Sequence, residues 1–398
     1  MQLVAYGAQD IYLTGNPQIT FFKVVYRRHT NFSMEEIAQT ASGTEALGSE
    51  ATYTISRNGD LVHKMYVQYN NHGTDSSTMC GSFGHTILKE IECEIGGQKI
   101  DKHYGHWLEV WSNLTEPNSV GSTPTGGSSS GPEGGNESLT TYGPTKYQRM
   151  AGISTNVTGG GGSGDERYFV PLRFWFNRNP GLALPLIALQ YHEVKIKIVY
   201  EGAAGNTATV GAVKPQLFVQ YIYLDTDERR RFAQVSHEYL IEQLQFQKEG
   251  TKETFTLNFN HPVKEIIWTG APDPISDGSA GIAPTRDTSM NPNGTDEWQL
   301  KLNGHERTSK RHSTHFTRQQ IYDYHTGYGG VVNNDSIAVY SFALKPEEHQ
   351  PSGTCNFSRI DTAQLVCSGT TGGDIHIYAV NYNVLRIMSG MGGLAYSN

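Results

Sequence analysis

Apolar and polar residues alternate with a period of two in several short segments of this chain. Ile91, Cys93 and Ile95 alternate with glutamates, and residues 194–198, 255–259 and 298–302 follow the same pattern. Such alternation is typical of strands with one buried face and one solvated face. We therefore predict antiparallel sheets that pack together as sandwiches.

One motif occurs twice: an alternating strand, a glycine turn, a basic segment with two histidines, and an aromatic stretch. The copies cover residues 91–107 and 298–316. Aligning Gly97 with Gly304 gives an offset of 304 − 97 = 207 positions in a chain of 398 residues. This spacing predicts two copies of one module, which favours an assembly protein over an enzyme.

Helical periodicity is confined to two short segments, and each follows the repeated glycine turn. Trp107, Leu108, Trp111 and Leu114 have helical spacing, and residues 317–325 are a weaker candidate. So little helix is incompatible with a parallel α/β fold. The expected fold class is all-β.

A segment rich in Gly, Ser, Thr, Asn and Pro, residues 115–166, is the main difference between the two halves. It cannot bury enough apolar surface to fold alone, so we expect an exposed loop. The expected organisation is an N-terminal arm (residues 1–31), a first sandwich (32–224, including the loop 115–166), a charged linker (225–236) and a second sandwich (237–398).

Composition agrees with a strand-rich chain of two domains. The 22 Tyr and 15 Phe suit half-buried pleated surfaces, and 44 Gly and 16 Pro supply turns. A net charge of −8 gives no general attraction to nucleic acid, so no direct nucleic-acid binding is expected. Four cysteines without a C-x-x-C pair indicate buried thiols in a reducing compartment. The first residues lack a secretory signal pattern, which favours synthesis in the cytosol.

Two histidine pairs, His103 with His106 and His312 with His315, are the constellations that most resemble metal ligands. A cupin-type centre would need His-x-His with a Glu and a further His inside one barrel, and the sequence lacks that pattern. The glycine-rich loops lack the ending of a phosphate-binding loop, and no G-x-S-x-G elbow occurs. We therefore expect no catalytic, cofactor-binding or metal site.

Two further sets of residues are candidates for surface contacts. Lys23, Arg27 and Arg28 form a cationic cluster beside an aromatic arm, which suits an acidic partner, an anionic lipid surface or an ion pair within a subunit contact. Asn-x-Ser/Thr sequons, mostly in predicted loops, are candidates for carrying glycans: Asn113, Asn136, Asn156, Asn293 and Asn334.

Longer stretches in both halves and at both ends resemble one known family. They include the arm at residues 3–32, PGLALPLIALQYHEV at 180–194, HEYLIEQLQF at 237–246, YSFALKP at 340–346, QPSGTCNFSRID at 350–361 and residues 381–398. In these stretches the chain is similar to the major capsid proteins of nucleocytoplasmic large DNA viruses, and to the phycodnavirus-like members above all.

The resemblance implies a double jelly roll, that is, two tandem eight-stranded jelly-roll sandwiches with long surface loops and few short helices. It implies a homotrimer with a pseudo-hexagonal outline, and capsomers that tile an icosahedral shell around an internal membrane. Minor capsid and penton proteins would be further partners. Lys23, Arg27 and Arg28 would face inward and the loop 115–166 outward. The location would be the virion capsid, after assembly in the host cytoplasm.

Two other functions are compatible with the residues. A two-domain, lectin-like glycan-binding protein would use its loop rims, although aromatic platforms would suit that role better than these Gly, Ser and Thr loops. A bicupin-like metalloenzyme would use the two histidine pairs.

Overall fold

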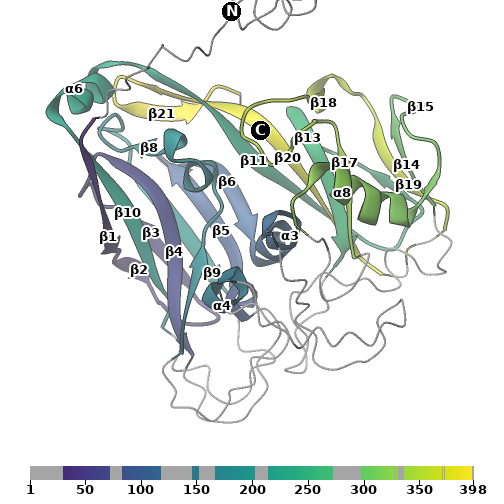
Figure 1. Cartoon of the computed structure of the whole chain (residues 1–398), viewed down its shortest axis with the longest axis horizontal. Helices are drawn as coiled ribbons and strands as arrows, with labels where there is room; N and C mark the ends of the chain where they lie inside the picture. Colours follow the sequence, from purple (N-terminus) through teal and green to yellow (C-terminus); the bar gives the residue numbers. More distant parts are fainter. Residues whose placement is uncertain are drawn as a thin grey trace, which may run out of the picture.

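The computed structural model describes residues 30–71, 83–117, 146–151, 166–201, 214–271, 297–327, 329, 336–369, 371 and 373–396. These residues form four antiparallel sheets. The sheets are stacked in pairs as two sandwiches that lie side by side (Figure 1). The predicted all-β class and sandwich packing are therefore confirmed.

Two five-stranded sheets build the first sandwich. One has the order β1 (Phe32–Ala38), β10 (Gln216–Leu224), β4 (Leu61–Asn71) and β7 (Glu166–Pro171), with β8 (Leu184–Pro185) beside β4. The other has the order β2 (Ala41–Gly43), β3 (Glu50–Thr54), β9 (Val194–Tyr200), β5 (Leu88–Ile95) and β6 (Gln98–Tyr104). Ile91, Cys93 and Ile95 are buried as predicted, because alternate side chains of a strand point into the space between the sheets.

A six-stranded and a five-stranded sheet build the second sandwich. The larger has the order β11 (His237–Glu249), β20 (Ile375–Met388), β13 (Pro262–Gly270) and β17 (Ile337–Ser341), with β18 (Cys355–Asn356) beside β13 and β21 (Met391–Leu394) beside β20. The smaller has the order β12 (Thr254–Thr256), β19 (Ala363–Cys367), β14 (Glu297–Leu302) and β15 (His305–Glu306), with β16 (Arg311–His312) beside β14. These numbers include very short end strands, so eight principal strands per sandwich stays a prediction.

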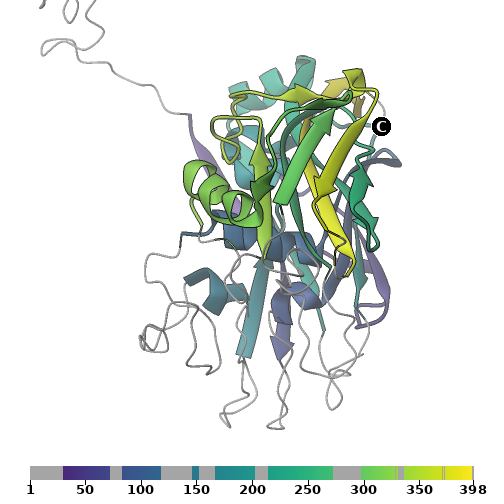
Figure 2. The same cartoon turned by 90° about the vertical axis from the view of Figure 1, so that its right-hand side faces the viewer.

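The helical segments are short, as expected. They are α2 (Phe83–Thr86), α3 (Gly105–Thr115), α4 (Lys146–Ala151), α5 (Trp175–Arg178), α6 (Thr226–Gln234), α8 (Gln320–Tyr324), a π-helical turn η4 (His315–Gln319), and 3-10 turns η2 (Pro180–Leu182) and η5 (Phe357–Arg359). Both predicted helices are confirmed, the first as α3 and the second as η4 with α8. Figure 2 shows the η4–α8 segment on the outside of the sheet that carries β17. The expected linker, residues 225–236, contains helix α6.

The two aligned glycines occupy equivalent turns. Gly97 follows Gly96 in the two-residue turn between β5 and β6, and Gly304 follows Asn303 in the two-residue turn between β14 and β15. All four residues have positive φ, between 51° and 82°. Two consecutive positive φ angles match the right-handed twist of a tight hairpin, and Gly and Asn accept them most easily. The repeated motif therefore marks the same structural position in each sandwich.

A ribbon of two long strands joins the sandwiches. β11 has 13 residues and β20 has 14, and they pair along their whole shared length. Ile377 of β20 lies in the core of the second sandwich, whereas Leu385 and Ile387, further along the same strand, lie in the core of the first. Ile241 of β11 is also in the first core. Residues 237–398 thus contribute to both cores. The linker separates the two sandwiches along the sequence but does not separate their cores.

We predict that Ile387→Ala destabilises the first sandwich although the residue lies near the C-terminal end of the described chain. Ile387 is 1% exposed, so its truncation leaves a cavity and should lower the free energy of unfolding by about 2–5 kcal/mol. Its neighbour Met388 is 49% exposed, and Met388→Ala is the matched control with an expected change below about 0.5 kcal/mol. Chemical denaturation measures both, and equal effects of the two variants would contradict the shared core.

Candidate functional site at the seam between the sandwiches

The contact between the two sandwiches is called the seam here. Helix α3 lies in the seam and supplies its apolar part (Figure 1). The apolar residues of α3 that pack toward the second sandwich are Trp107, Val110, Trp111 and Leu114. They form one cluster with residues of the second sandwich: Ile267, Ile321, Ile337, Val339, Tyr378 and Val380. Burial of this much apolar surface is the main source of adhesion between the sandwiches.

The backbone at the end of α3 is also bonded across the seam. Gly327 N donates to Leu114 O at 2.7 Å, and Gly329 N donates to Asn113 O at 2.9 Å. A Cβ atom on Gly327 would lie only 2.4 Å from Asn113 O. The close approach therefore requires glycine at this position, and it satisfies carbonyl groups that the end of a helix leaves without helical partners.

A β-bulge in β13 brings two charged residues to the seam. Val263 pairs with Asn381 and Glu265 pairs with Val380, so Lys264 is the extra residue. Val263 and Ile266 point into the second core, while Lys264 and Glu265 lie on the other side with 0% exposure. Strict alternation would direct one of the two charges into that core, so the bulge is what makes this sequence compatible with a strand.

Glu242 of β11 joins cations from both sandwiches. Its Oε2 is paired with Arg178 at the end of α5, in the first sandwich. Its Oε1 lies 2.9 Å from Lys264 Nζ and 3.4 Å from His349 Nδ1, in the second sandwich. The Arg178 guanidinium also lies over the Trp111 ring, 5.1 Å from its centre. This arrangement, the Glu242 cluster, connects the apolar and ionic parts of the seam.

The two cations keep Glu242 ionised. Burial alone would raise the pKa of this carboxyl, which is 3% exposed, but Arg178 and Lys264 outweigh burial and hold the pKa well below its usual range. Burial lowers the pKa of Lys264, and the nearby Glu242 opposes that shift. Neither member of the pair tolerates the loss of the other, since each is desolvated.

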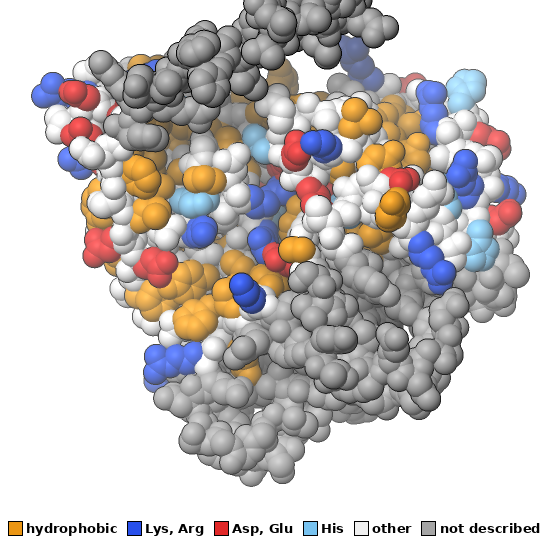
Figure 3. Space-filling model, viewed as in Figure 1, with side chains coloured by type: hydrophobic (Ala, Val, Ile, Leu, Met, Phe, Trp, Pro, Cys, Tyr) orange, Lys and Arg blue, Asp and Glu red, His pale blue; other side chains and the backbone are white. Residues whose placement is uncertain are grey.

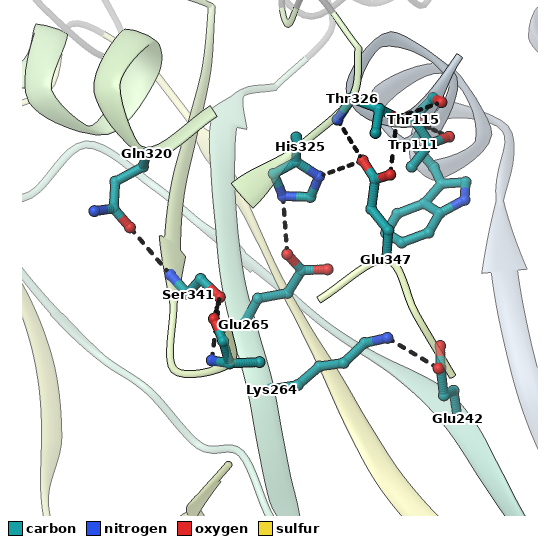
Figure 4. A network of polar contacts seen from close by, with 11 residues as sticks. Trp111, Thr115, Glu242, Lys264, Glu265, Gln320, His325, Thr326, Ser341 and Glu347 are labelled. Atoms are coloured by element: carbon teal, nitrogen blue, oxygen red, sulfur yellow. Dashed lines mark hydrogen bonds and ion pairs between the residues drawn. The ribbon is translucent and has the colours of Figure 1, made fainter. Parts of the chain in front are cut away.

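His325 forms a second ion cluster at the end of α8. Its Nε2 lies 3.0 Å from Glu265 Oε2, and its Nδ1 lies 3.1 Å from Glu347 Oε1 (Figure 4). Glu347 also accepts from Thr326, whose hydroxyl donates to Thr115 O of α3 at 3.0 Å. Burial would lower the pKa of His325, but Glu265 and Glu347 raise it to about 9. The ring is therefore an imidazolium that donates to a carboxylate on each side.

A cavity of about 10 Å³ lies beside the Glu242 cluster, lined among others by Asp101, His103, Arg173 and Arg178. That volume is enough for about one water molecule. Pockets for organic ligands have volumes of about 300–1,000 Å³. The cavity is therefore a packing gap in a closed contact, and the chemistry available here is adhesion between the sandwiches.

The histidine pairs singled out in the sequence do not converge. His103 Nε2 is 2.9 Å from Asp101 Oδ2, whereas His106 Nδ1 is 2.7 Å from the Tyr378 hydroxyl across the seam. His312 Nδ1 contacts Thr314, and His315 Nδ1 contacts Gln319. Within the described ranges no three His, Cys, Asp or Glu residues are grouped as metal ligands. The residues of the bicupin-like alternative therefore serve the seam or the surface of the second sandwich.

Most of the contact candidates lie outside the described residues: Lys23, Arg27, Arg28, Asn136, Asn156, Asn293 and Asn334. Asn113 is described, and it lies within helix α3 rather than in a loop. Its amide donates to Glu109 O at 2.9 Å and its side chain is half-buried, so this position differs from the exposed loop that a glycan acceptor requires. None of the described helices has the length and apolar character needed to cross a bilayer.

The sequence reasoning missed the residues of both ion clusters. Their only signal is a charge inside an otherwise apolar strand, as in Leu240-Ile-Glu242 and Val263-Lys-Glu265. Such charges are almost never buried unless they are paired, so a pair of them in two strands indicates a contact between those strands.

Comparison with known proteins gives a consistent result along the whole chain. Residues 20–225 match the family described as the major capsid protein N-terminus, and residues 228–393 match the large eukaryotic DNA virus major capsid protein. The major capsid protein of Pyramimonas orientalis virus is 51% identical over 100% of this chain and 99% of its own length. That of Paramecium bursaria Chlorella virus 1 is 40% identical with the same coverage.

Solved structures agree. A chain of the PBCV-1 virus capsid has a TM-score of 0.75 and 36% identity, with 95% of this chain and 100% of that chain covered. The Faustovirus major capsid protein, at 13% identity and a TM-score of 0.67, shares the fold. The paired sandwiches are thus a double jelly roll, and the lectin-like alternative has no support among these matches.

We predict that Glu242→Gln lowers the free energy of unfolding by about 3–5 kcal/mol, because it leaves the fully buried Lys264 and the partly buried Arg178 without a carboxylate. Glu238, on the same strand, pairs with Arg386 at 2.8 Å, but the side chains are 59% and 51% exposed. Glu238→Gln is therefore the matched control and should cost less than about 1 kcal/mol. Denaturant titration compares the two, and a Glu242→Gln variant as stable as the control would contradict the role of the cluster.

We predict a loss of stability at alkaline pH from His325. Its pKa is raised from 6.5 to about 9 on folding, so its contribution is fully present below about pH 6.5 and is lost as the pH rises through about 9. A shift of this size corresponds to about 3 kcal/mol. Thermal unfolding between pH 6 and pH 10 should show a steeper alkaline decline for the wild type than for His325→Gln. Parallel pH profiles of the two proteins would exclude this assignment.

Proposed function

This chain belongs to the family of major capsid proteins of large eukaryotic DNA viruses, and we propose that three copies of it form each pseudo-hexagonal capsomer of an icosahedral shell. It is a structural protein of the virion capsid. Within the proposal the chain acts by association and carries out no catalysis.

The rigid pairing of two similar sandwiches carries this proposal. Three chains supply six similar units, while the ring itself needs only threefold symmetry to close. Such a ring has an almost sixfold outline only if the two sandwiches of each chain keep a fixed relative position. The ribbon of β11 and β20, helix α3 and the two ion clusters support that fixed position.

Further partners follow from the same role. We propose contacts with minor capsid and penton proteins, an internal membrane near the inner side of the shell, and assembly in the host cytoplasm. Lys23, Arg27 and Arg28 are the candidates for contacts on the inner side. The sequons Asn136, Asn156, Asn293 and Asn334 stay candidates for glycans on the outer side.

We expect native mass spectrometry to give three times the chain mass of 44.0 kDa. Obligate interfaces of this kind bury about 2,000–5,000 Å² or more, so the trimer should persist at micromolar concentration. Sedimentation velocity across a dilution series is an independent measurement. A stable monomer at these concentrations would contradict the capsomer.

A further inference from the structure

The outer surfaces of the chain differ in whether positive and negative side chains lie close enough to pair. On the outer face of the sheet with β5 and β9, carboxylates lie beside lysines, with Lys197 Nζ 3.0 Å from Glu50 Oε1 and Lys102 Nζ 2.8 Å from Glu90 Oε2. On two other surfaces, at opposite ends of the molecule, charges of one sign predominate.

The first of these, the β1 surface, follows the edge strand β1. Phe32, Met34 and Glu36 lie on its outer face with the adjoining Tyr66 and Phe218, and Glu35 lies on the opposite face of the same strand. Strand β1 is an edge strand, and Phe32 and Met34 are 62% and 55% exposed. Tyr66 and Phe218 stack with ring centres 5.4 Å apart on the outer side of the sheet, where both stay half-exposed.

The two carboxylates of the β1 surface bond to tyrosines rather than to cations. Tyr66 Oη donates to Glu36 at 2.7 Å, and Tyr223 Oη donates to Glu35 at 2.9 Å. No Lys, Arg or His of the described chain lies within ion-pair distance of Glu35 or Glu36. The surface therefore combines exposed apolar groups with one negative charge on each face of the strand, and among the described residues no strand pairs with the outer edge of β1.

The second surface, the basic strip, consists of Arg307, Lys310, Arg311 and Arg318 around β16 and η4. Residues 305–318 hold these four cations and one carboxylate, Glu306, a net charge of 4 − 1 = +3 in a chain with a net charge of −8. All four side chains are exposed, and no described carboxylate forms an ion pair with Arg307, Lys310 or Arg311. Beside them on α8, Tyr322 is 87% exposed.

The two surfaces lie at opposite ends of the long axis of the molecule. Figure 1 places β1 and β10 at the left and β14, β15 and β19 at the right. In Figure 3 hydrophobic side chains gather at the left, where Figure 1 draws β1, β4 and β10. Lys, Arg and His side chains lie along the right edge, together with a few Asp and Glu side chains. Surfaces so far apart on one chain cannot meet each other, but they can meet on two copies.

We propose that the β1 surface of one copy of this chain binds the basic strip of the next, in a head-to-tail contact that repeats around the capsomer. The inference rests on the proposed trimer and names the surfaces that build it. A heterologous contact of this kind closes a ring when its rotation is a third of a turn. Opposite charges set the register of the copies, and the exposed aromatic and apolar side chains add buried area.

Charge reversal on each surface tests the contact. The double variants Glu35→Lys with Glu36→Lys, and Lys310→Glu with Arg311→Glu, each oppose like charges at every contact, so each should raise the concentration at which the trimer dissociates by at least about tenfold. The quadruple variant carries all four changes on one chain, which restores opposite charges at every contact. It should again form trimers near the wild-type concentration.

The matched control is Glu193→Lys with Glu253→Lys, two exposed carboxylates outside both surfaces and the same change in net charge as the first variant. It should leave the trimer unchanged. Sedimentation velocity reads the assembly state, and circular dichroism of each variant establishes that the chain is folded.

The outcomes separate this proposal from the proposed function. A wild-type trimer that every reversal leaves intact would overturn the assignment of surfaces and leave the capsomer standing. A monomeric wild type would overturn the trimer itself. If Lys310→Glu with Arg311→Glu abolished binding to duplex DNA and left the trimer intact, the basic strip would be a nucleic-acid contact and the proposal would be wrong.

Discussion

One buried carboxylate between two cations fixes how the halves of this molecule sit on each other. Glu242 is paired with Arg178 of the first sandwich and Lys264 of the second, and neither Glu242 nor Lys264 is accessible to water. Ions lose their hydration on burial, and ion pairing offsets that loss only in a narrow range of geometries. A buried cluster therefore selects one arrangement more than it adds stability. The apolar contacts of helix α3 supply the adhesion and tolerate small shifts. The ion cluster therefore fixes the relative orientation of two sandwiches that the apolar contacts hold together.

The path of the chain reinforces this orientation. β11 begins at the first sandwich and runs into the second, and β20 runs back in the opposite direction. Ile241, Leu385 and Ile387 of these strands complete the core of the first sandwich. A hinge between the sandwiches would have to break the pairing of β11 with β20 and expose these residues. The double jelly roll of this chain is therefore one mechanical body, although its two halves follow one another in the sequence and share an equivalent hairpin turn.

Sequence patterns predicted the repeated and local features and missed the contacts between distant residues. The strand at residues 91–95, helix α3 and the paired turns at Gly97 and Gly304 each depend on neighbours in the chain, so periodicity and turn chemistry predict them. The bulge at Lys264 is invisible to a period-two pattern, because one extra residue changes which face the following side chains occupy. The histidine pairs are conspicuous in the sequence. The seam depends instead on Glu242 and His325, whose charged partners are between 264 − 242 = 22 and 349 − 242 = 107 positions away in the sequence.

Ion pairs in the seam are buried in protein, whereas charges on the outer surfaces are exposed to water. This difference lets the chain fold before its copies associate. Inside the seam, charges are desolvated and paired within the chain, so salt in solution screens them weakly. Glu36 and Arg311 are exposed, and the attraction between such groups on two copies is weakened as ionic strength rises. The chain can therefore complete its two sandwiches under conditions in which contacts between copies are still reversible. A tile that is rigid before it associates can correct a wrong neighbour without unfolding, which a shell of many identical contacts requires.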